Sequence, residues 1–288
     1  MSSRHHELTV TGGVIRTAKL RDEWYRDIES PTDLVERLKE EQRQGRLRAD
    51  LFTFWQRIPE VKRKYDYFTE WESVAALPIK NYDFWWEQQI NPKIRNMVRK
   101  AEKRSVEIRI VPYTDEFVSG ITKIFNESPT RQGRSFWHFG KTFETVKKEF
   151  AKNLFREELI GAYYRNELIG FIMLADAGKF AVTSQILGSI HHRDKSPINA
   201  LLAKAVQICA DRNFSHLVYA SWVEGTLGDF KRHNGFERVD LPRYYVPLTL
   251  KGRLSLRGHL HHGVTGLFPP RVLTLLKSLR STYYRARG

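Results

Sequence analysis

Residues 159–202 read LIGAYYRNELIGFIMLADAGKFAVTSQILGSIHHRDKSPINALL, and this stretch decides the expected fold. It contains three short apolar segments separated by the turn-forming residues Asn166 and Gly178, which predicts three consecutive antiparallel strands. A helix is expected to begin at Pro197 with Ser196 as its N-cap, because apolar residues then recur at the i, i+3, i+4 and i+7 spacing of a buried helix face. The three expected strands are 159–164, 168–175 and 180–187.

Two helices are expected before this stretch, and a strand, a short helix and a last strand after it. Thr226 and Asp229 resemble a capping box that opens the short helix, and Asn234-Gly235 is a typical end for it. The complete order is helix, helix, three antiparallel strands, helix, strand, helix, strand. The flanking elements are expected at 115–126, 142–154, 216–222, from 226 and at 236–248.

The first part of the chain mixes strands with two further helices. Ser30 supplies an N-cap and Pro31 the first position of a helix over 31–44. The second helix, over 92–104, is rich in Lys and Arg. Strands are expected at 51–55, 74–79 and 106–111.

The composition excludes several classes of protein. The chain has 288 residues, of which 41% are hydrophobic and 12% aromatic, so an intrinsically disordered chain is not expected. A single cysteine, Cys209, excludes an internal disulfide framework and a thiolate zinc site. The longest apolar stretch is too short to span a bilayer, and the N-terminal residues are polar, without a secretory signal. These features predict a soluble cytoplasmic protein.

The net charge is +15, and most of it lies near the C-terminus. Residues 241–288 carry nine Lys or Arg and no Asp or Glu, which leaves +6 on the first 240 residues. Such a segment attracts phosphate-bearing partners such as RNA, anionic lipid or phosphorylated glycolipid, although it is also compatible with a solvated tail. An apolar stripe after Pro269 predicts a helix that packs on its own domain or lies at the inner face of a membrane.

Three short motifs then carry a resemblance to a known family. They are NMVRKAEKRSV at 96–106, SPINALL at 196–202 and FKRHNGF at 230–236. With the order of elements, they make the chain resemble the GNAT superfamily of acyl-CoA N-acyltransferases, and more closely its Fem-like branch of aminoacyl transferases.

The resemblance implies an α/β GNAT-like fold, in which a mixed central sheet is flanked by helices. It assigns residues 111–250 to the acyltransferase domain. Residues 1–110 then form a smaller N-terminal α+β module, a degenerate first copy if the chain follows the tandem Fem-like plan, and residues 251–288 form a basic C-terminal segment with an amphipathic helix.

The resemblance also implies a place for the cofactor, at the start of the helix that follows the fourth strand of the fold. A helix N-terminus offers unpaired N–H groups and a favourable dipole to a pyrophosphate. The family's glycine-rich pattern is missing there, which weakens acyl-CoA (acetyl-CoA) as the donor and favours the aminoacyl-tRNA that Fem-like proteins accept. An ordinary capped core helix is the alternative. The cofactor-binding candidates are Arg193, Lys195, Ser196 and Asn199.

Lys231 is the leading catalytic candidate. Many GNAT enzymes have a tyrosine at this place, four residues before a Gly-Phe pair, whereas Fem-like transferases resemble this chain in having lysine after phenylalanine. An ammonium group there would stabilise a developing oxyanion or the leaving group. The alternative is a solvated lysine on an exposed helix face.

The loop from Glu127 to His138 is the second candidate region, because the resemblance places the acceptor pocket there. Glu127 and His138 are candidate general bases for the attacking amine, and forked guanidinium groups suit an anionic acceptor. The same residues are also ordinary loop formers. The substrate-binding candidates are Arg131, Gln132 and Arg134, with Tyr244 on the last strand.

No metal site is expected, because a run of histidines at 259–262 without a neighbouring ligand is usually a solvent-exposed run. Glu70 and Glu72 lie at strand spacing on one face, where a site role is open.

The function expected from the sequence is N-acyl transfer, by direct attack, onto an amino group of a sugar, amino acid or cell-envelope glycoconjugate precursor. The alternative is a non-catalytic module that holds RNA or an anionic membrane surface through its basic faces.

Overall fold

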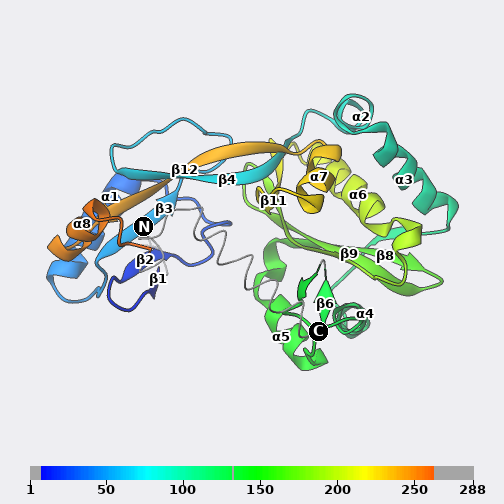
Figure 1. Cartoon of the computed structure of the whole chain (residues 1–288), viewed down its shortest axis with the longest axis horizontal. Coiled ribbons are helices and arrows are strands. Elements are labelled where there is room, and N and C mark those ends of the chain that lie inside the picture. Colours follow the sequence, from blue (N-terminus) through cyan, green and yellow to red (C-terminus); the bar gives the residue numbers. More distant parts are fainter. Residues whose placement is uncertain (1–7, 132, 263–288) are drawn as a thin grey trace. The chain divides into compact units, whose positions relative to one another are not determined.

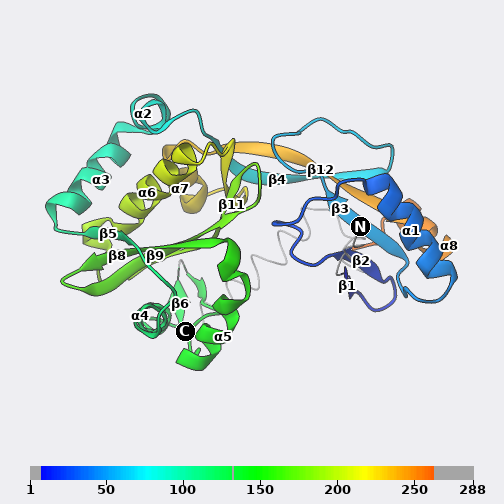
Figure 2. The same ribbon diagram turned by 180° about the vertical axis from the view of Figure 1, so that it is seen from behind.

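The computed structural model of the protein describes residues 8–131 and 133–262 (Figures 1 and 2). The chain forms two compact units, which are Met1–Glu72 with Asp240–Gly288 (unit 1) and Ser73–Val239 (unit 2). The boundaries fall within two long strands, β4 (Phe68–Pro78) and β12 (Glu237–Pro247).

These units divide the chain differently from the three parts expected at 1–110, 111–250 and 251–288. One reason is that the basic helix α3 (Pro92–Lys103) packs with α6 (Pro197–Asp211) in the core of unit 2, where Ile94 and Ala101 join the same apolar cluster as Leu201. The expected amphipathic helix after Pro269, with most of the C-terminal positive charge, lies outside the described residues.

Unit 2 is built on a mixed sheet with the strand order β4-β11-β10-β9-β8-β5. The meander expected from the sequence is confirmed, since β8 (Glu157–Tyr164), β9 (Glu167–Asp176) and β10 (Ala181–Gly188) pair antiparallel in succession. The strand β5 (Glu107–Ile110) adds to the outer edge of β8. On the other side, β10 pairs parallel with β11 (His216–Ser221).

Helices cover both faces of this sheet (Figures 1 and 2). Along β9, Phe171 and Met173 face the cluster of α4 and α5, whereas Ile172 and Leu174 face that of α3 and α6. This alternation is the two-residue period of a strand that is buried on both sides. The remaining elements of unit 2 are α2 (Tyr82–Phe84), the π-helical turn η1 (Trp85–Gln89), α4 (Asp115–Phe125), β6 (Thr130–Arg131), β7 (Arg134–Ser135), α5 (Phe143–Phe150), the 3-10 turns η2 (Ala151–Arg156) and η3 (Arg193–Lys195), and α7 (Thr226–His233).

In unit 1 the strand order is β1 (Leu8–Thr11), β2 (Thr17–Leu20), β3 (Leu51–Trp55) and β12. The helix α1 (Pro31–Arg43) packs Leu34 and Leu38 on Phe52 and Tyr244, which forms the core of this unit. The expected cap is confirmed, because the Ser30 side chain accepts a hydrogen bond from the Asp33 N–H. On the other face, α8 (Leu250–Arg257) packs Leu256 on Leu51 and Tyr245.

The capping box predicted at Thr226 was wrong. Gly225, not Thr226, is the N-cap of α7, and its helix start has no side-chain cap. The capping box does not form because Thr226 is already the first helical residue, and Asp229 instead accepts a hydrogen bond from Arg232 at 2.5 Å. Among the described residues, no helix is long and apolar enough to cross a membrane.

We expect Tyr244→Phe to lower the free energy of unfolding by about 1–3 kcal/mol, the usual cost of leaving buried polar partners unsatisfied. The Tyr244 hydroxyl is fully buried, donates to Gln56 Oε1 at 2.7 Å and accepts from the Lys64 N–H at 2.8 Å. Urea unfolding measures the change. Tyr67→Phe in the same aromatic cluster is the control, since Tyr67 is partly exposed and its effect should be smaller. Equal stability of Y244F and wild type would contradict this role.

Candidate functional site

The central feature of unit 2 is the point where two parallel strands part. In the described chain, the parallel pairing of β10 with β11 covers two residue pairs, Ala181–Leu217 and Val182–Val218. A bulge follows in β10 between Thr183 and Gln185. The end of β10, residues 186–188, then lines a cavity instead of pairing with β11. Separation of adjacent strands in this way exposes a strand edge to a ligand.

This cavity, the strand-end cavity, has a volume of about 530 Å³. Its walls are the end of β10, the start of α6, Tyr219 of β11, the start of α7 and Met97 of α3. Four of the predicted site residues are among the polar side chains that line it: Arg131, Arg193, Ser196 and Asn199. The structure therefore brings three of the four cofactor-binding candidates together with one substrate-binding candidate.

The start of α6 is shaped by Ser196, which has a left-handed backbone with φ of 55°. Its N–H donates to the Arg193 carbonyl and its hydroxyl lies 3.3 Å from Met97 Sδ, so the side chain does not cap the helix as expected. Pro197 has no N–H, and the Asn199 N–H donates to the Ser196 carbonyl. Few N–H groups at this helix start are therefore available to an anion.

Arg131 fastens the loop after α4 to the end of β10. Its guanidinium donates to the Gly188 carbonyl at 2.8 Å and to the Ile124 carbonyl at 2.6 Å, and it pairs with Glu127 Oε2 at 3.1 Å. Glu127 Oε2 also accepts from the Ile190 N–H at 2.7 Å. Burial lowers the pKa of Arg131, and the charge of Glu127 opposes that shift. We call this group of contacts the Arg131 clamp.

His138 belongs to the same loop, and its buried ring is stacked on Phe125 with ring centroids 4.0 Å apart. Its Nε2 lies 3.2 Å from Gln185 Nε2. Burial, and then the charge of Lys141, lower the pKa of His138 from 6.5 to about 4. The imidazole is therefore neutral near pH 7, and it is not among the residues that line the strand-end cavity.

Lys231 is buried rather than solvated. Its ammonium donates to the carbonyls of Tyr219 and Ser221, each at 2.8 Å, and lies 4.5 Å from the centroid of the Tyr219 ring. Burial lowers the pKa of Lys231 from 10.5 to about 8. Since Tyr219 and Phe230 line the cavity and Lys231 does not, its charge lies just behind the cavity wall.

The other candidates lie elsewhere. Lys195 pairs with Asp194 and lies over the Tyr164 ring, and Arg134 is exposed on β7. Tyr244 is buried in the core of unit 1, where its aromatic neighbours hold it, and Gln132 lies outside the described residues. Met97, Tyr219 and the other apolar cavity residues were not predicted from the sequence. Met97 in the NMVRKAEKRSV motif and Phe230 in the FKRHNGF motif were the available signals.

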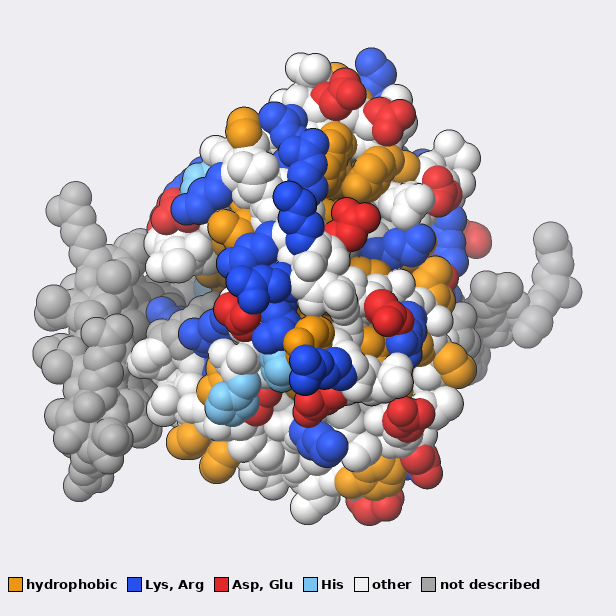
Figure 3. All heavy atoms as spheres, turned by 90° about the vertical axis from the view of Figure 1, so that its right-hand side faces the viewer, with side chains coloured by type: hydrophobic (Ala, Val, Ile, Leu, Met, Phe, Trp, Pro, Cys, Tyr) orange, Lys and Arg blue, Asp and Glu red, His pale blue; other side chains and the backbone are white. Residues whose placement is uncertain are grey.

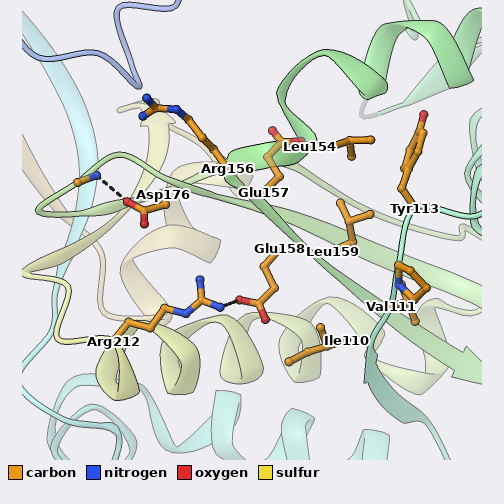
Figure 4. A pocket seen from close by; sticks show the side chains of 12 residues that line it. Ile110, Val111, Tyr113, Leu154, Arg156, Glu157, Glu158, Leu159, Asp176 and Arg212 are labelled. Carbon is orange, nitrogen blue, oxygen red and sulfur yellow. Dashed lines mark hydrogen bonds and ion pairs between the residues drawn. The ribbon is translucent and has the colours of Figure 1, made fainter.

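A second cavity, of about 790 Å³, lies where β8 begins and β9 ends (Figure 4). Glu157, Glu158 and Asp176 line it together with Arg156 and Arg212, and the Arg212 guanidinium pairs with Glu158. The Ser184 hydroxyl donates to Glu157 at 2.7 Å, and burial raises the pKa of Glu157. Its charged groups are mixed in sign and it contains none of the predicted site residues.

A stripe of Lys and Arg side chains runs down the face of unit 2 that carries α3 (Figure 3). Lys195 and Arg165 both lie over the Tyr164 ring, and Arg104 is close enough to Asp194 to lower its carboxyl pKa, after the larger effect of Lys195. Because Arg193 of the neighbouring turn lines the strand-end cavity, positive charge extends from this surface to the cavity.

Comparison with known proteins identifies the fold. No family model matches the sequence, and no curated protein matches it. The chain is similar in structure to FemX, with 12% identity and a TM-score of 0.59 over 86% of this chain and 85% of that one. It is also similar to the C-terminal domain (DUF2156) of a putative lysylphosphatidylglycerol synthetase from Agrobacterium fabrum, with 12% identity and a TM-score of 0.55 over 87% of this chain and 83% of that one.

A third similar structure is L-PGS from Bacillus licheniformis, with 13% identity and a TM-score of 0.53 over 87% of this chain and 84% of that one. At this level of identity the likeness concerns the fold alone. The GNAT-like, Fem-like fold expected from the sequence is confirmed, with its mixed sheet flanked by helices.

We expect His138 to make stability fall between pH 6.5 and pH 4. The folded state keeps the imidazole neutral to about pH 4, whereas the unfolded chain binds a proton near 6.5, so acid favours unfolding in this window. From pH 7.5 to 5 the loss should be about 1–2 kcal/mol. Urea unfolding of wild type and His138→Phe, which keeps the ring stack, measures it. An NMR titration that places His138 near 6.5 would contradict the expectation.

Proposed function

We propose that the protein is an N-acyltransferase that moves an aminoacyl group from an ester donor onto an amino group of a sugar, amino acid or cell-envelope glycoconjugate precursor. The observation that carries this proposal is the strand-end cavity, where an open strand edge, the cationic side chains Arg131 and Arg193, and the buried charge of Lys231 converge. When the amine attacks a bound acyl group, the carbonyl oxygen develops negative charge, which positively charged side chains placed there in advance would stabilise.

The mechanism we propose is direct attack. The acceptor nitrogen bonds to the acyl carbon, the ester C–O bond breaks, the nitrogen loses a proton to a base, and the leaving oxygen takes up a proton. A covalent enzyme intermediate on the lone thiol is disfavoured, because Cys209 is buried and burial raises its pKa from 9 to about 12.

Glu127 is the better of the two candidate bases. Its Oε2 is held by the Arg131 clamp, and its Oε1 accepts no hydrogen bond from any residue that the structure describes. His138 suits this role less, because its ring is buried against Phe125 and its Nε2 lies 3.2 Å from Gln185 Nε2. Lys231 is proposed to stabilise the negative charge that develops on the acyl oxygen or the leaving group.

An aminoacyl ester is favoured over acyl-CoA as the donor. At the start of α6, Pro197 has no N–H, and the N–H groups of Ser196 and Asn199 bond to nearby carbonyls. A pyrophosphate cradle of backbone donors is therefore poorly supported. The basic stripe beside the cavity supports a polyanionic carrier, which makes aminoacyl-tRNA the proposed donor (Figure 3). The FemX and L-PGS folds are consistent with a transferase of this kind.

The test uses bulk tRNA charged with ¹⁴C-labelled amino acids and, as acceptors, lysine, glucosamine and a UDP-linked muropeptide. We expect the protein to form an alkali-stable amide product, because an untransferred ester hydrolyses in alkali. Lys231→Met should lower kcat about 100-fold, the usual cost of removing one oxyanion stabiliser. Lys179→Met, at an exposed turn, is the matched control and should keep wild-type activity.

The wild-type rate should also fall as the pH rises above about 8, where Lys231 loses its charge. Transfer from ¹⁴C-acetyl-CoA but not from charged tRNA would overturn the proposed donor. Salt-sensitive tRNA binding with no transfer from either donor would instead favour the non-catalytic binding module.

A further inference from the structure

Three side chains far apart in the sequence meet in unit 1. Glu70 of β4 lies between two consecutive histidines that follow α8, with Oε1 2.8 Å from His261 Nε2 and Oε2 2.7 Å from His262 Nε2. Their three ligand-type atoms all lie within 4.8 Å of one another. The sequence predicts a solvent-exposed run of histidines here, because the carboxylate partner of His261 is 191 residues away.

The three side chains differ in solvent exposure, so the cluster has a buried side and a solvent-exposed side. The His261 side chain is 1% exposed, Glu70 32% and His262 47%, so the cluster closes on one side and opens to solvent on the other. Aromatic rings form the closed side, since Phe68 and Tyr245 lie 5.4 Å and 4.8 Å from the His261 ring. A cation could enter from the open side without rearrangement of the core.

Glu70 interacts with the two imidazoles and with the Tyr245 hydroxyl, whose pKa is raised by burial and then by the charge of Glu70. The Arg243 guanidinium on the same strand as Tyr245 is paired with Glu23 at 3.1 Å and with Glu72 at 2.5 Å. His261 Nδ1 is buried and has no hydrogen-bond partner among the described residues. This buried imidazole therefore meets the cluster through Nε2 alone, and Nδ1 is left to carry the ring proton when Nε2 offers a lone pair.

We propose that Glu70, His261 and His262 bind one zinc-type divalent cation. Two imidazole nitrogens and one carboxylate oxygen are ligands that Zn²⁺ prefers, and three protein ligands leave a fourth position for water. Binding requires each Nε2 to direct a lone pair at the metal, so a neutral imidazole carries its proton on Nδ1, whereas an imidazolium releases one proton to solvent. The cation ties the unit 1 part of β4 to the residues after α8.

The site is tested on the whole chain after treatment with EDTA and removal of the chelator. Isothermal titration with ZnCl₂ at pH 7.5 should show one Zn²⁺ per chain, and the melting temperature should rise with Zn²⁺ because only the folded chain presents all three ligands. Glu70→Gln and His262→Ala should each weaken binding at least about 100-fold, since loss of outer-sphere partners alone costs roughly 10- to 100-fold.

His259→Ala is the matched control, because His259 is exposed and lies beside the cluster but contributes no ligand atom to it. It should keep wild-type affinity, and circular dichroism of the metal-free variants checks that each is folded. Because the His262 side chain is about half-exposed, we expect the H262A variant to fold without metal. A stoichiometry near zero, or Zn²⁺ binding that is equal in wild type, E70Q and H262A, would overturn the site.

Discussion

A buried guanidinium holds the end of β10 in place, and the strand-end cavity depends on it. Arg131 donates to the Gly188 carbonyl while its partner Glu127 accepts the Ile190 N–H, so one ion pair satisfies backbone groups that a neighbouring strand would otherwise satisfy. Unpaired backbone groups are costly when buried. The Arg131 clamp therefore lets β10 leave β11 after two residue pairs and still end in an ordered conformation.

The clamp also fixes the positions of two charged side chains beside the cavity. Both members are nearly buried, with side chains 11% and 12% exposed, so each needs the other and neither is available as a freely mobile charge. A buried pair contributes more to a defined geometry than to net stability, because desolvation offsets much of the attraction. Lys231 adds a third buried polar group, held by two carbonyls of β11 behind Tyr219.

Local patterns predicted most elements of unit 2. The meander of β8, β9 and β10 and the start of α6 followed from periodicity and turn residues, because these signals depend on neighbours in the chain. The full length of β4 was missed, since Glu70 and Glu72 interrupt its apolar pattern and their partners His261, His262 and Arg243 lie about 170–190 residues away. Capping was predicted correctly at Ser30 but wrongly at Thr226 and Ser196, where the backbone enters the helix by another route.

The sequence by itself determined most strands and helices of unit 2 and which of their faces are apolar, and a family resemblance placed a candidate site at the start of α6. Only the tertiary structure decided which polar side chains reach that site. Arg131 and Asn199 line one cavity, whereas Tyr244 is buried in the core of unit 1 and His138 is buried against Phe125. The reason is physical: periodicity reports which side of an element is buried, but the partners of a polar group are set by elements distant in the chain.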